Sequence, residues 1–277
     1  MTAARDTLAD RIGVWLARKL VEPSPGFRPY THANVQALRR VLQPGDVLLV
    51  EGNTRVSTAI KYLTQSTWSH AALYVGNALG QVTPDGEPLC LVEVNLGEGC
   101  IAAPLSKYAF FNTRICRASN LSPQDRAQIV DFMTGKLGTR YDLKNITDLL
   151  RFFLPTPPVP LRWRRRLLAF GSGDPTRAIC SSLIAQAYER IRYPILPDIS
   201  RTTGHASAES QFSRSEIMHI RHHSLYTPRD FDLSPYFEVV KPTLEYGFDY
   251  RSLTWDEPDL RPDVVDAGLP APLPDGG

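Results

Sequence analysis

The alternation of apolar and polar positions divides the chain into segments that suit a mixed helix and strand fold. Short apolar runs predict buried strands, and the clearest are 47–50, 68–76, 89–94, 100–103, 113–118 and 237–240. Apolar residues at helical spacing predict helices, of which the clearest are 33–42, 56–63 and 123–138. Asp85–Gly86 is a hairpin signal between two of the strands. These patterns predict an α+β fold with a small antiparallel sheet.

Both ends of the chain and one internal segment depart from this pattern. An N-terminal amphipathic helix and a proline-rich connector are predicted over 1–30, followed by one main domain over 31–245. Within this domain, 155–176 is a basic, proline-rich insertion. The segment 246–277 is acidic and rich in proline and glycine, so we expect it to be disordered.

Charge and cysteine usage narrow the class of protein. The formal net charge of +2 gives no reason to expect a nucleic-acid partner. The four cysteines are widely spaced, which favours neither a zinc site nor a disulfide framework, so we expect no metal, no cofactor and a reducing compartment. Charged residues interrupt the N-terminal apolar pattern, and no apolar run approaches about 20 residues. A cytoplasmic or peripherally membrane-associated protein without signal peptide or transmembrane helix is therefore expected.

Cys180 stands at the start of a predicted helix whose apolar face includes Leu183, Ile184 and Ala187. Free backbone N–H groups and the helix dipole stabilise a thiolate there, which makes Cys180 a candidate nucleophile. Two other interpretations remain open. A helix that begins at Asp174–Pro175 would place Cys180 in its second turn, and free cysteines often only fill space in a core.

His70 and Glu93 are candidate partners for this thiol. Glu93 lies between Val92 and Val94, and a carboxylate in an apolar run is unusual without a partner. Antiparallel pairing of the two strands would place it beside His70, where it would accept the second imidazole N–H and fix the tautomer. The alternatives are a structural histidine and a solvated glutamate on an edge strand.

Taken in order, four segments resemble the YiiX-like proteins, the circularly permuted branch of the NlpC-type papain-fold superfamily, which is also related to lecithin:retinol acyltransferase. The segments are 44–46 (Pro-Gly-Asp), 68–76, 91–94 and 179–183. The resemblance covers about residues 42 to 243. Papain itself runs cysteine before histidine, whereas here His70 precedes Cys180. The resemblance implies a permuted papain-like fold in which the small sheet packs against the nucleophile-bearing helix.

The resemblance also implies roles for particular residues. Cys180 would be the nucleophile, His70 the base and Glu93 the orienting group. The Gly-x-x-Tyr element at 138–141 implies that Tyr141 lines the site, and Ser181 and Ser182 are further candidates for substrate binding. Unpermuted cell-wall peptidases carry an aspartate directly before the cysteine; here the position is occupied by isoleucine, so their choice of substrate is not implied.

The function expected from these residues is a thiol-dependent hydrolase that cleaves an amide or peptide bond through a Cys-His-Glu triad and an acyl-enzyme intermediate. Two alternatives stay open. One is a lipid-directed acyltransferase or esterase, and the other is a catalytically inert papain-like binding domain. The expected substrate is accordingly a small peptide, an acyl amide or a lipid.

The insertion contains the clearest candidate for a surface contact. A basic and aromatic cluster lies just before the nucleophile helix and consists of Arg162, Trp163, Arg164, Arg165 and Arg166. It suits a lid or peripheral contact with an anionic membrane. The alternative is a solvated helix that packs on its own domain.

Overall fold

The computed structural model of the chain describes residues 22, 27–30, 34–95, 98–139, 179–201, 216–219, 226–245, 247–252 and 254. The predicted helix near the N-terminus and the whole insertion 155–176 lie outside these residues. Of the predicted tail 246–277, the described part contains the short 3-10 helix η3 (Tyr250–Ser252).

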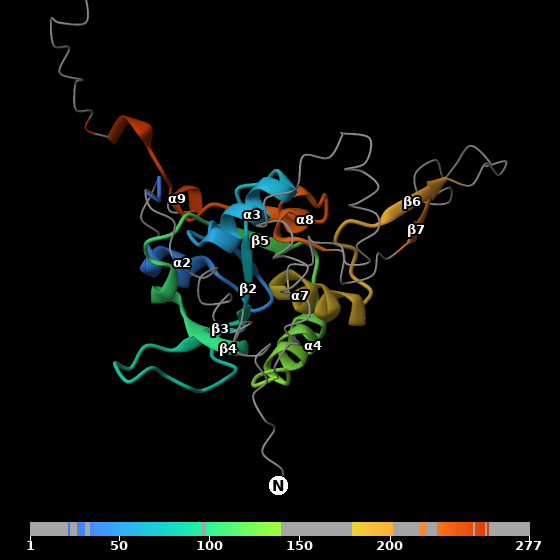
Figure 1. Cartoon of the computed structure of the whole chain (residues 1–277), viewed down its shortest axis with the longest axis horizontal. Coiled ribbons are helices and arrows are strands. Elements are labelled where there is room, and N and C mark those ends of the chain that lie inside the picture. Colours follow the sequence, from blue (N-terminus) through green and yellow to red (C-terminus); the bar gives the residue numbers. More distant parts are fainter. Residues whose placement is uncertain are drawn as a thin grey trace, which may run out of the picture.

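A six-stranded antiparallel sheet forms the centre of the molecule (Figure 1). Its spatial order is β4-β3-β2-β1-β5-β8. The strands are β1 (Val47–Val50), β2 (His70–Tyr74), β3 (Leu89–Asn95), β4 (Gly99–Pro104), β5 (Thr113–Ala118) and β8 (Phe237–Val240). The predicted α+β fold with an antiparallel sheet is confirmed.

Helices cover both faces of the sheet, and the alternation of side chains along β1 decides which residue meets which layer. Val47 and Leu49 belong to a core that includes Tyr188 of α7 (Ile179–Arg190). Helices α4 (Pro123–Thr134) and α7 lie side by side on this face (Figure 1). The core of the opposite face contains Leu48 and Val50. It is completed by α2 (Val35–Val41) and the 3-10 helix η1 (Leu105–Tyr108).

The Pro-Gly-Asp turn before β1 is tied to a neighbouring strand by a buried ion pair. The Asp46 carboxylate is 1 % exposed. It accepts hydrogen bonds from Arg117 Nε at 2.9 Å and Nη2 at 2.7 Å, and from the Gln43 backbone N–H at 2.8 Å. Gly45 has a φ of +94°, a conformation that favours glycine. The turn therefore fixes the start of β1 against β5.

One predicted turn is in fact the start of a helix. The Thr-Pro-Arg-Asp sequence at 227–230 predicts a turn, but it opens α8 (Pro228–Leu233). The Asp230 carboxylate accepts hydrogen bonds from the Thr227 N–H at 2.6 Å and the Thr227 hydroxyl at 2.9 Å, as in a capping box. The turn prediction was wrong because the same Thr-Pro-x-Asp residues suit a turn and a helix N-terminus.

Other boundaries also differ from the sequence patterns. Helix α3 (Arg55–Thr64) begins close to its predicted start, whereas α4 ends at Thr134 rather than at Gly138. Tyr193–Pro194 and Leu196–Pro197 predict the end of regular structure. The chain instead continues in β6 (Asp198–Arg201), which pairs with β7 (Glu216–His219) in a separate two-stranded sheet that extends away from the main one (Figure 1). A short helix α9 (Pro242–Glu245) follows β8.

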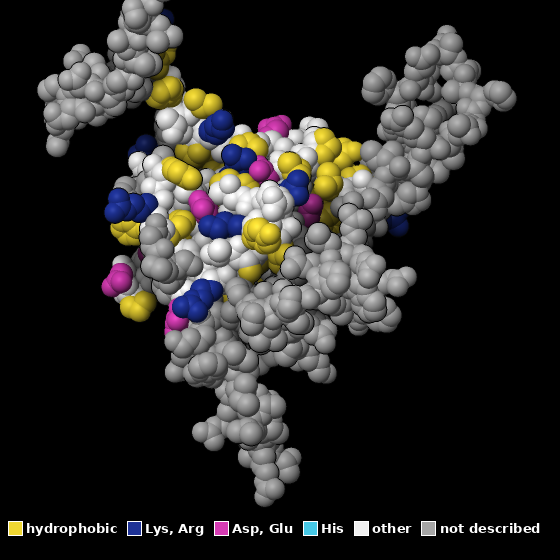
Figure 2. Space-filling view, turned by 45° about the horizontal axis from the view of Figure 1, so that its top comes forward, with side chains coloured by type: hydrophobic (Ala, Val, Ile, Leu, Met, Phe, Trp, Pro, Cys, Tyr) yellow, Lys and Arg dark blue, Asp and Glu magenta, His cyan; other side chains and the backbone are white. Residues whose placement is uncertain are grey.

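The surface carries mixed side chains. Figure 2 shows lysine and arginine side chains scattered among hydrophobic ones over the coloured part of one face. Within the part of the chain that the structure describes, no helix has both the length and the apolar character needed to cross a bilayer.

Candidate active site

His70 lies between Cys180 and Glu93. It is the first residue of β2, and Cys180 belongs to the first turn of α7, which packs against β2 and β3. The imidazole Nε2 is 3.0 Å from Glu93 Oε2. The ring also forms a side-chain hydrogen bond with Cys180. Since Nε2 faces the carboxylate, Nδ1 is the nitrogen left for the thiol.

The strand register explains why histidine and glutamate meet. Antiparallel pairing sets Ala72 opposite Glu93. His70 is therefore a diagonal neighbour of Glu93 on the same face of the sheet, within reach of a long side chain. The first turn of α7 brings Cys180 to the start of β2, where the backbone N–H groups of Ala71 and Ser181 donate to its sulfur.

The electrostatics of the pair favour a thiolate beside an imidazolium. Burial alone would lower the pKa of His70, but the charge and hydrogen bond of Cys180, followed by those of Glu93, raise it to about 10. Burial alone would raise the pKa of Cys180, but the charge and hydrogen bond of His70 lower it. A thiol with a lowered pKa next to a histidine with a raised pKa is the arrangement of an activated cysteine nucleophile.

The other three cysteines have the opposite character. Burial raises the pKa of Cys90, raises that of Cys100 to about 11 and raises that of Cys116 to about 12. None of these three has a histidine among the groups that shift its pKa. Thiolate chemistry near neutral pH therefore points to Cys180 among the four cysteines.

Glu93 is the centre of a group that we call the Glu93 cluster, formed by Glu93 with His70, Asn95, Lys107 and Tyr108. Oε1 accepts from the Lys107 ammonium and from Asn95 Nδ2, the latter at 3.3 Å. Oε2 accepts hydrogen bonds from the Tyr108 hydroxyl and from His70 Nε2. The side chain of Glu93 is fully buried, which alone would raise its pKa, yet His70 and then Lys107 lower it to about 2. Glu93 is thus a carboxylate with four donors.

Lys107 and Tyr108 are site residues that the sequence analysis missed. Both come from η1, which follows β4 and has no periodic pattern of its own. The one signal in the sequence was Glu93 itself, because a carboxylate in an apolar run requires buried donors. That signal does not say which donors supply the hydrogen bonds.

The remaining predicted site residues differ in their placement. Ser181 is fully buried, and its hydroxyl donates to the backbone oxygen of Tyr226 at 2.7 Å, which holds α7 to the segment before α8. Its contribution beside the thiol comes from the backbone N–H. Ser182 is partly exposed in the same turn. Tyr141 and Arg162–Arg166 lie outside the described residues.

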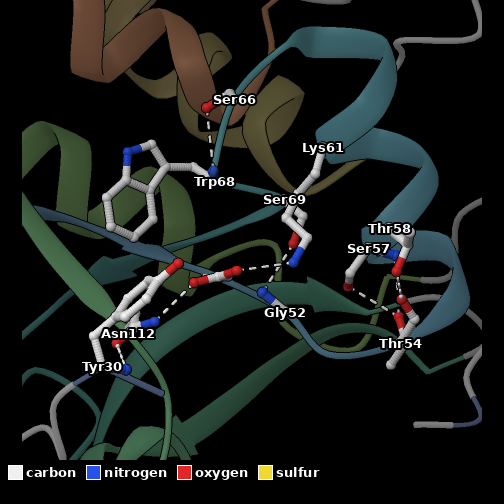
Figure 3. Close-up of polar contacts among 11 residues, drawn as sticks. Tyr30, Gly52, Thr54, Ser57, Thr58, Lys61, Ser66, Trp68, Ser69 and Asn112 are labelled. Atoms are coloured by element: carbon white, nitrogen blue, oxygen red, sulfur yellow. Dashed lines mark hydrogen bonds and ion pairs between the residues drawn. The ribbon is translucent and has the colours of Figure 1, made fainter. Parts of the chain in front are cut away.

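A second carboxylate group lies just beyond β1, whose last residue, Val50, pairs with His70. We call it the Glu51 cluster: Glu51 accepts from Lys61 Nζ at 2.9 Å and from Asn112 Nδ2 at 2.7 Å. Asn112 Oδ1 accepts the backbone N–H of Tyr30 at 2.9 Å. Figure 3 shows Asn112 and Tyr30 on one side of this group and Lys61 on the other.

Gly52 joins the Glu51 cluster to the strand that carries His70. Its N–H donates to the hydroxyl of Ser69, the residue before His70, at 2.9 Å (Figure 3). A Cβ at position 52 would lie 2.2 Å from Ser57 Oγ and 2.8 Å from Ser69 Oγ, so only glycine fits without displacing its neighbours. The backbone beside His70 is fixed by this close approach.

The described residues contain no group of three or more His, Cys, Asp or Glu side chains placed to hold a metal ion. The four donors of the Glu93 cluster are directed at the Glu93 carboxylate.

Comparison with known proteins supports the resemblance seen in the sequence. Residues 41–151 match the family model of the permuted papain-like amidase enzymes of the YaeF/YiiX type, the C92 family. Among solved structures, the chain is similar to the metalloprotein YiiX from Escherichia coli O157:H7, with 14% identity, 72% of this chain and 96% of that chain covered, and a TM-score of 0.40. No curated protein matches. The family match, which includes His70 and Glu93, confirms the predicted resemblance to YiiX-like proteins and supports a hydrolase.

Proposed function

We propose that this chain is a thiol-dependent hydrolase of an amide or peptide bond, with residues 31–245 as its catalytic domain. Cys180 is the nucleophile, His70 moves the proton, and Glu93 orients the imidazole. The observation that carries the proposal is that one histidine ring hydrogen-bonds to a cysteine with a lowered pKa and to a buried carboxylate. This is the arrangement of nucleophile, base and orienting group that acyl transfer requires.

Acylation begins from the thiolate and imidazolium. The Cys180 sulfur attacks the carbonyl carbon of the substrate, and the electron pair of the carbonyl moves to its oxygen. The backbone N–H of Cys180, at the start of α7, is a candidate donor to that oxyanion. When the intermediate collapses, the C–N bond breaks and the imidazolium gives its proton to the leaving nitrogen. The products of this step are a free amine and a thioester on Cys180.

Deacylation returns the site to its starting state. Neutral His70 accepts a proton from water as the water oxygen attacks the thioester carbon. Collapse breaks the C–S bond, releases a carboxylic acid and restores the thiolate beside an imidazolium. Throughout the cycle Glu93 accepts the Nε2 hydrogen bond and stabilises the positive ring.

Cysteine-specific alkylation tests the proposal without knowledge of the substrate. At pH 6, iodoacetamide should modify Cys180 faster than Cys90, Cys100 and Cys116, whose pKa values burial raises. His70→Ala should slow the reaction of Cys180 at this pH, because it removes the charge and the hydrogen bond that lower the pKa of the thiol. Peptide mapping by mass spectrometry measures all four rates in one sample. Equal rates at the four cysteines, unchanged in His70→Ala, would exclude an activated thiol.

The bond that is cleaved requires a second measurement. A panel of acyl amides, dipeptides and esters should yield a carboxylic acid with the wild type and none with Cys180→Ala. A covalent acyl adduct on Cys180, removable by hydroxylamine, should accumulate with slow substrates. Turnover of the esters alone would favour an esterase.

A second candidate, a lipid-directed acyltransferase or esterase, rests on the basic and aromatic cluster Arg162–Arg166. Arginines near an anionic membrane contribute about 1 kcal/mol each, which is enough for weak, salt-sensitive binding. Replacement of the four arginines by glutamine should abolish co-sedimentation with phosphatidylserine-containing vesicles at low salt. A wild type that never sediments with the vesicles would leave amide hydrolysis as the proposal.

A further inference from the structure

Two donors of the Glu93 cluster, Lys107 and Tyr108, come from the four-residue element η1. We infer that η1 is a positioning element for the proposed reaction. Lys107 and Tyr108 hydrogen-bond to the same Glu93 carboxylate as His70 and hold this carboxylate in place. They also limit how strongly the carboxylate stabilises the protonated His70 ring. The inference rests on the proposed function, because it assigns a task to groups behind the catalytic histidine. It concerns residues that hydrogen-bond to the Glu93 carboxylate rather than to the thiol.

The geometry gives the two residues separate oxygens of one carboxylate. Lys107 contacts Oε1, whereas Tyr108 contacts Oε2, the oxygen that also receives His70 Nε2. Tyr108 is 4 % exposed and its ring centroid lies 6.1 Å from that of His70. Lys107 Nζ lies over the Tyr108 ring, 5.5 Å from the ring centroid, and the Lys107 side chain is 36% exposed. Between them, the two donors therefore hold both oxygens of the carboxylate that binds the histidine.

The charges alternate through the site, from the Cys180 thiolate to the His70 imidazolium, the Glu93 carboxylate and the Lys107 ammonium. Of the four described side chains that hydrogen-bond to Glu93, His70 and Lys107 are the two that carry positive charge. Without Lys107, the whole charge of Glu93 would act on His70 and raise its pKa further. An imidazolium with a still higher pKa is a weaker acid toward the leaving nitrogen. Lys107 thus keeps the proton transferable.

Other titratable groups near Glu93 and His70 come from α7, from β4 and from the residue before β4. Cys180 faces His70 from α7, and Cys100 approaches Glu93 from β4. Glu98 approaches through Asn95, whose Nδ2 donates to both glutamates. Cys180 has the strongest effect of the groups that raise the pKa of His70, so it must be removed before the effect of Lys107 is measured.

The experiment is an NMR titration of His70 in a Cys180→Ser background, where the ring no longer faces a thiolate. The Cε1–H resonance is assigned through His70→Ala. Addition of Lys107→Met should raise the pKa of His70 by about one pH unit, as expected for loss of a cation a few ångströms behind the carboxylate. Tyr108→Phe should raise it by a smaller amount. Lys107→Arg retains the charge and should leave the titration in place.

Lys61→Met is the matched control. Lys61 is also partly exposed, pairs with a glutamate at 2.9 Å and lies over an aromatic ring, at 5.8 Å from the centroid of Phe27. It does not hydrogen-bond to Glu93. A shift in Lys107→Met no larger than in Lys61→Met would overturn the inference. If Lys107→Met does not fold, Lys107→Gln, which keeps a donor without the charge, must show the upward shift instead.

The titration separates failure of the inference from failure of the proposed function. If Cys180 in the wild type shows no enhanced alkylation at pH 6, the proposed function fails whatever His70 does. If Cys180 is activated and His70 titrates at the same pH with and without Lys107, only the role of η1 fails.

Discussion

Glu93 lies in β3 and Glu51 directly follows β1 of the same sheet, and each carboxylate is bound by a lysine and an asparagine. Glu51 accepts from Lys61 and Asn112 just after β1, and its side chain is 13% exposed. Glu93, within β3, accepts hydrogen bonds from Lys107 and Asn95, and the Glu93 side chain is fully buried. The two clusters therefore differ in burial and in the additional donors, which are His70 and Tyr108 in the Glu93 cluster.

The difference shows how one kind of ion pair serves two purposes. In the Glu51 cluster, the hydrogen bonds of Asn112 join the carboxylate to the backbone of Tyr30, so the group fastens a peripheral segment to the sheet. In the Glu93 cluster, His70 connects the carboxylate to a thiol, so the same charges set two pKa values. A lysine and an asparagine around a glutamate do not define a reactive site. The reactive site is defined by the additional histidine and by the full burial of the carboxylate.

Removal of each carboxylate should give the largest contrast. Glu93→Ala leaves Lys107, Tyr108 and His70 without their buried acceptor, and should lower the free energy of unfolding by about 3–5 kcal/mol. Glu51→Ala removes a pair that water partly screens, and should cost about 1 kcal/mol or less. Urea denaturation followed by circular dichroism measures both. Equal losses would show that burial does not separate the two clusters.

Acid should weaken the Glu93 cluster through its carboxyl group. The pKa of Glu93 is about 2 in the folded chain and 4.5 for an ordinary glutamate. The charged carboxylate therefore stabilises the fold above about pH 4.5, and this contribution is lost as the pH falls toward 2. Between pH 5 and pH 3 the wild type should lose about 2 kcal/mol more than Glu93→Gln does. If the free energy of unfolding fell by the same amount in both proteins across this range, the shift could not be assigned to Glu93.

Replacement of Gly52 tests the close backbone contact that joins the Glu51 cluster to the strand of His70. Gly52→Ala should destabilise the chain by about 1–2 kcal/mol, because the new Cβ overlaps Ser57 Oγ and crowds Ser69 Oγ. The double variant Gly52→Ala/Ser57→Ala removes the closest of these contacts. It should lose less than the sum of the two single variants, as a double-mutant cycle measures. Additive losses would mean that the overlap is not the cause.

Substitution of the asparagines should have the smallest effects on stability. Here the larger loss should occur in the Glu51 cluster and the smaller one in the Glu93 cluster. Asn112 is 8% exposed and uses both ends of its amide, so Asn112→Ala should cost about 1 kcal/mol. Asn95 is partly exposed and its bond to Glu93 is 3.3 Å long, so Asn95→Ala should cost less. Thermal unfolding of both variants checks the order.

Strand pattern alone predicted much of this architecture. Val47–Val50, Thr113–Ala118 and Phe237–Val240 are strands with the predicted bounds. Of the three, Val47–Val50 is a continuous apolar run, because β1 lies between β2 and β5 and is buried on both faces. Glu93 could be predicted to have a partner for the converse reason, since a buried carboxylate in an apolar run requires hydrogen-bond donors. Local patterns carried these predictions.

What the sequence could not supply depended on contacts between distant residues. Lys107 and Tyr108 follow Glu93 by 14 and 15 positions, and no spacing rule connects a 3-10 helix to a carboxylate on another strand. Trp68 Nε1 donates to Asp232 at 3.0 Å across 164 positions, a contact that required α8, which the sequence had suggested to be a turn. Ser181 was expected at the substrate, but the close packing of α7 on Tyr226 turns its hydroxyl inward.

The order of the site residues along the chain has a consequence for synthesis. The hairpin of β2 and β3 carries His70 and Glu93, and Cys180 follows His70 by about 110 residues. A ribosome that adds roughly 5–20 residues per second delivers the base and the carboxylate several seconds before the sulfur. The β2–β3 hairpin therefore leaves the exit tunnel without a nucleophile beside it. The nascent chain gains its reactive group only after most of the sheet has been made.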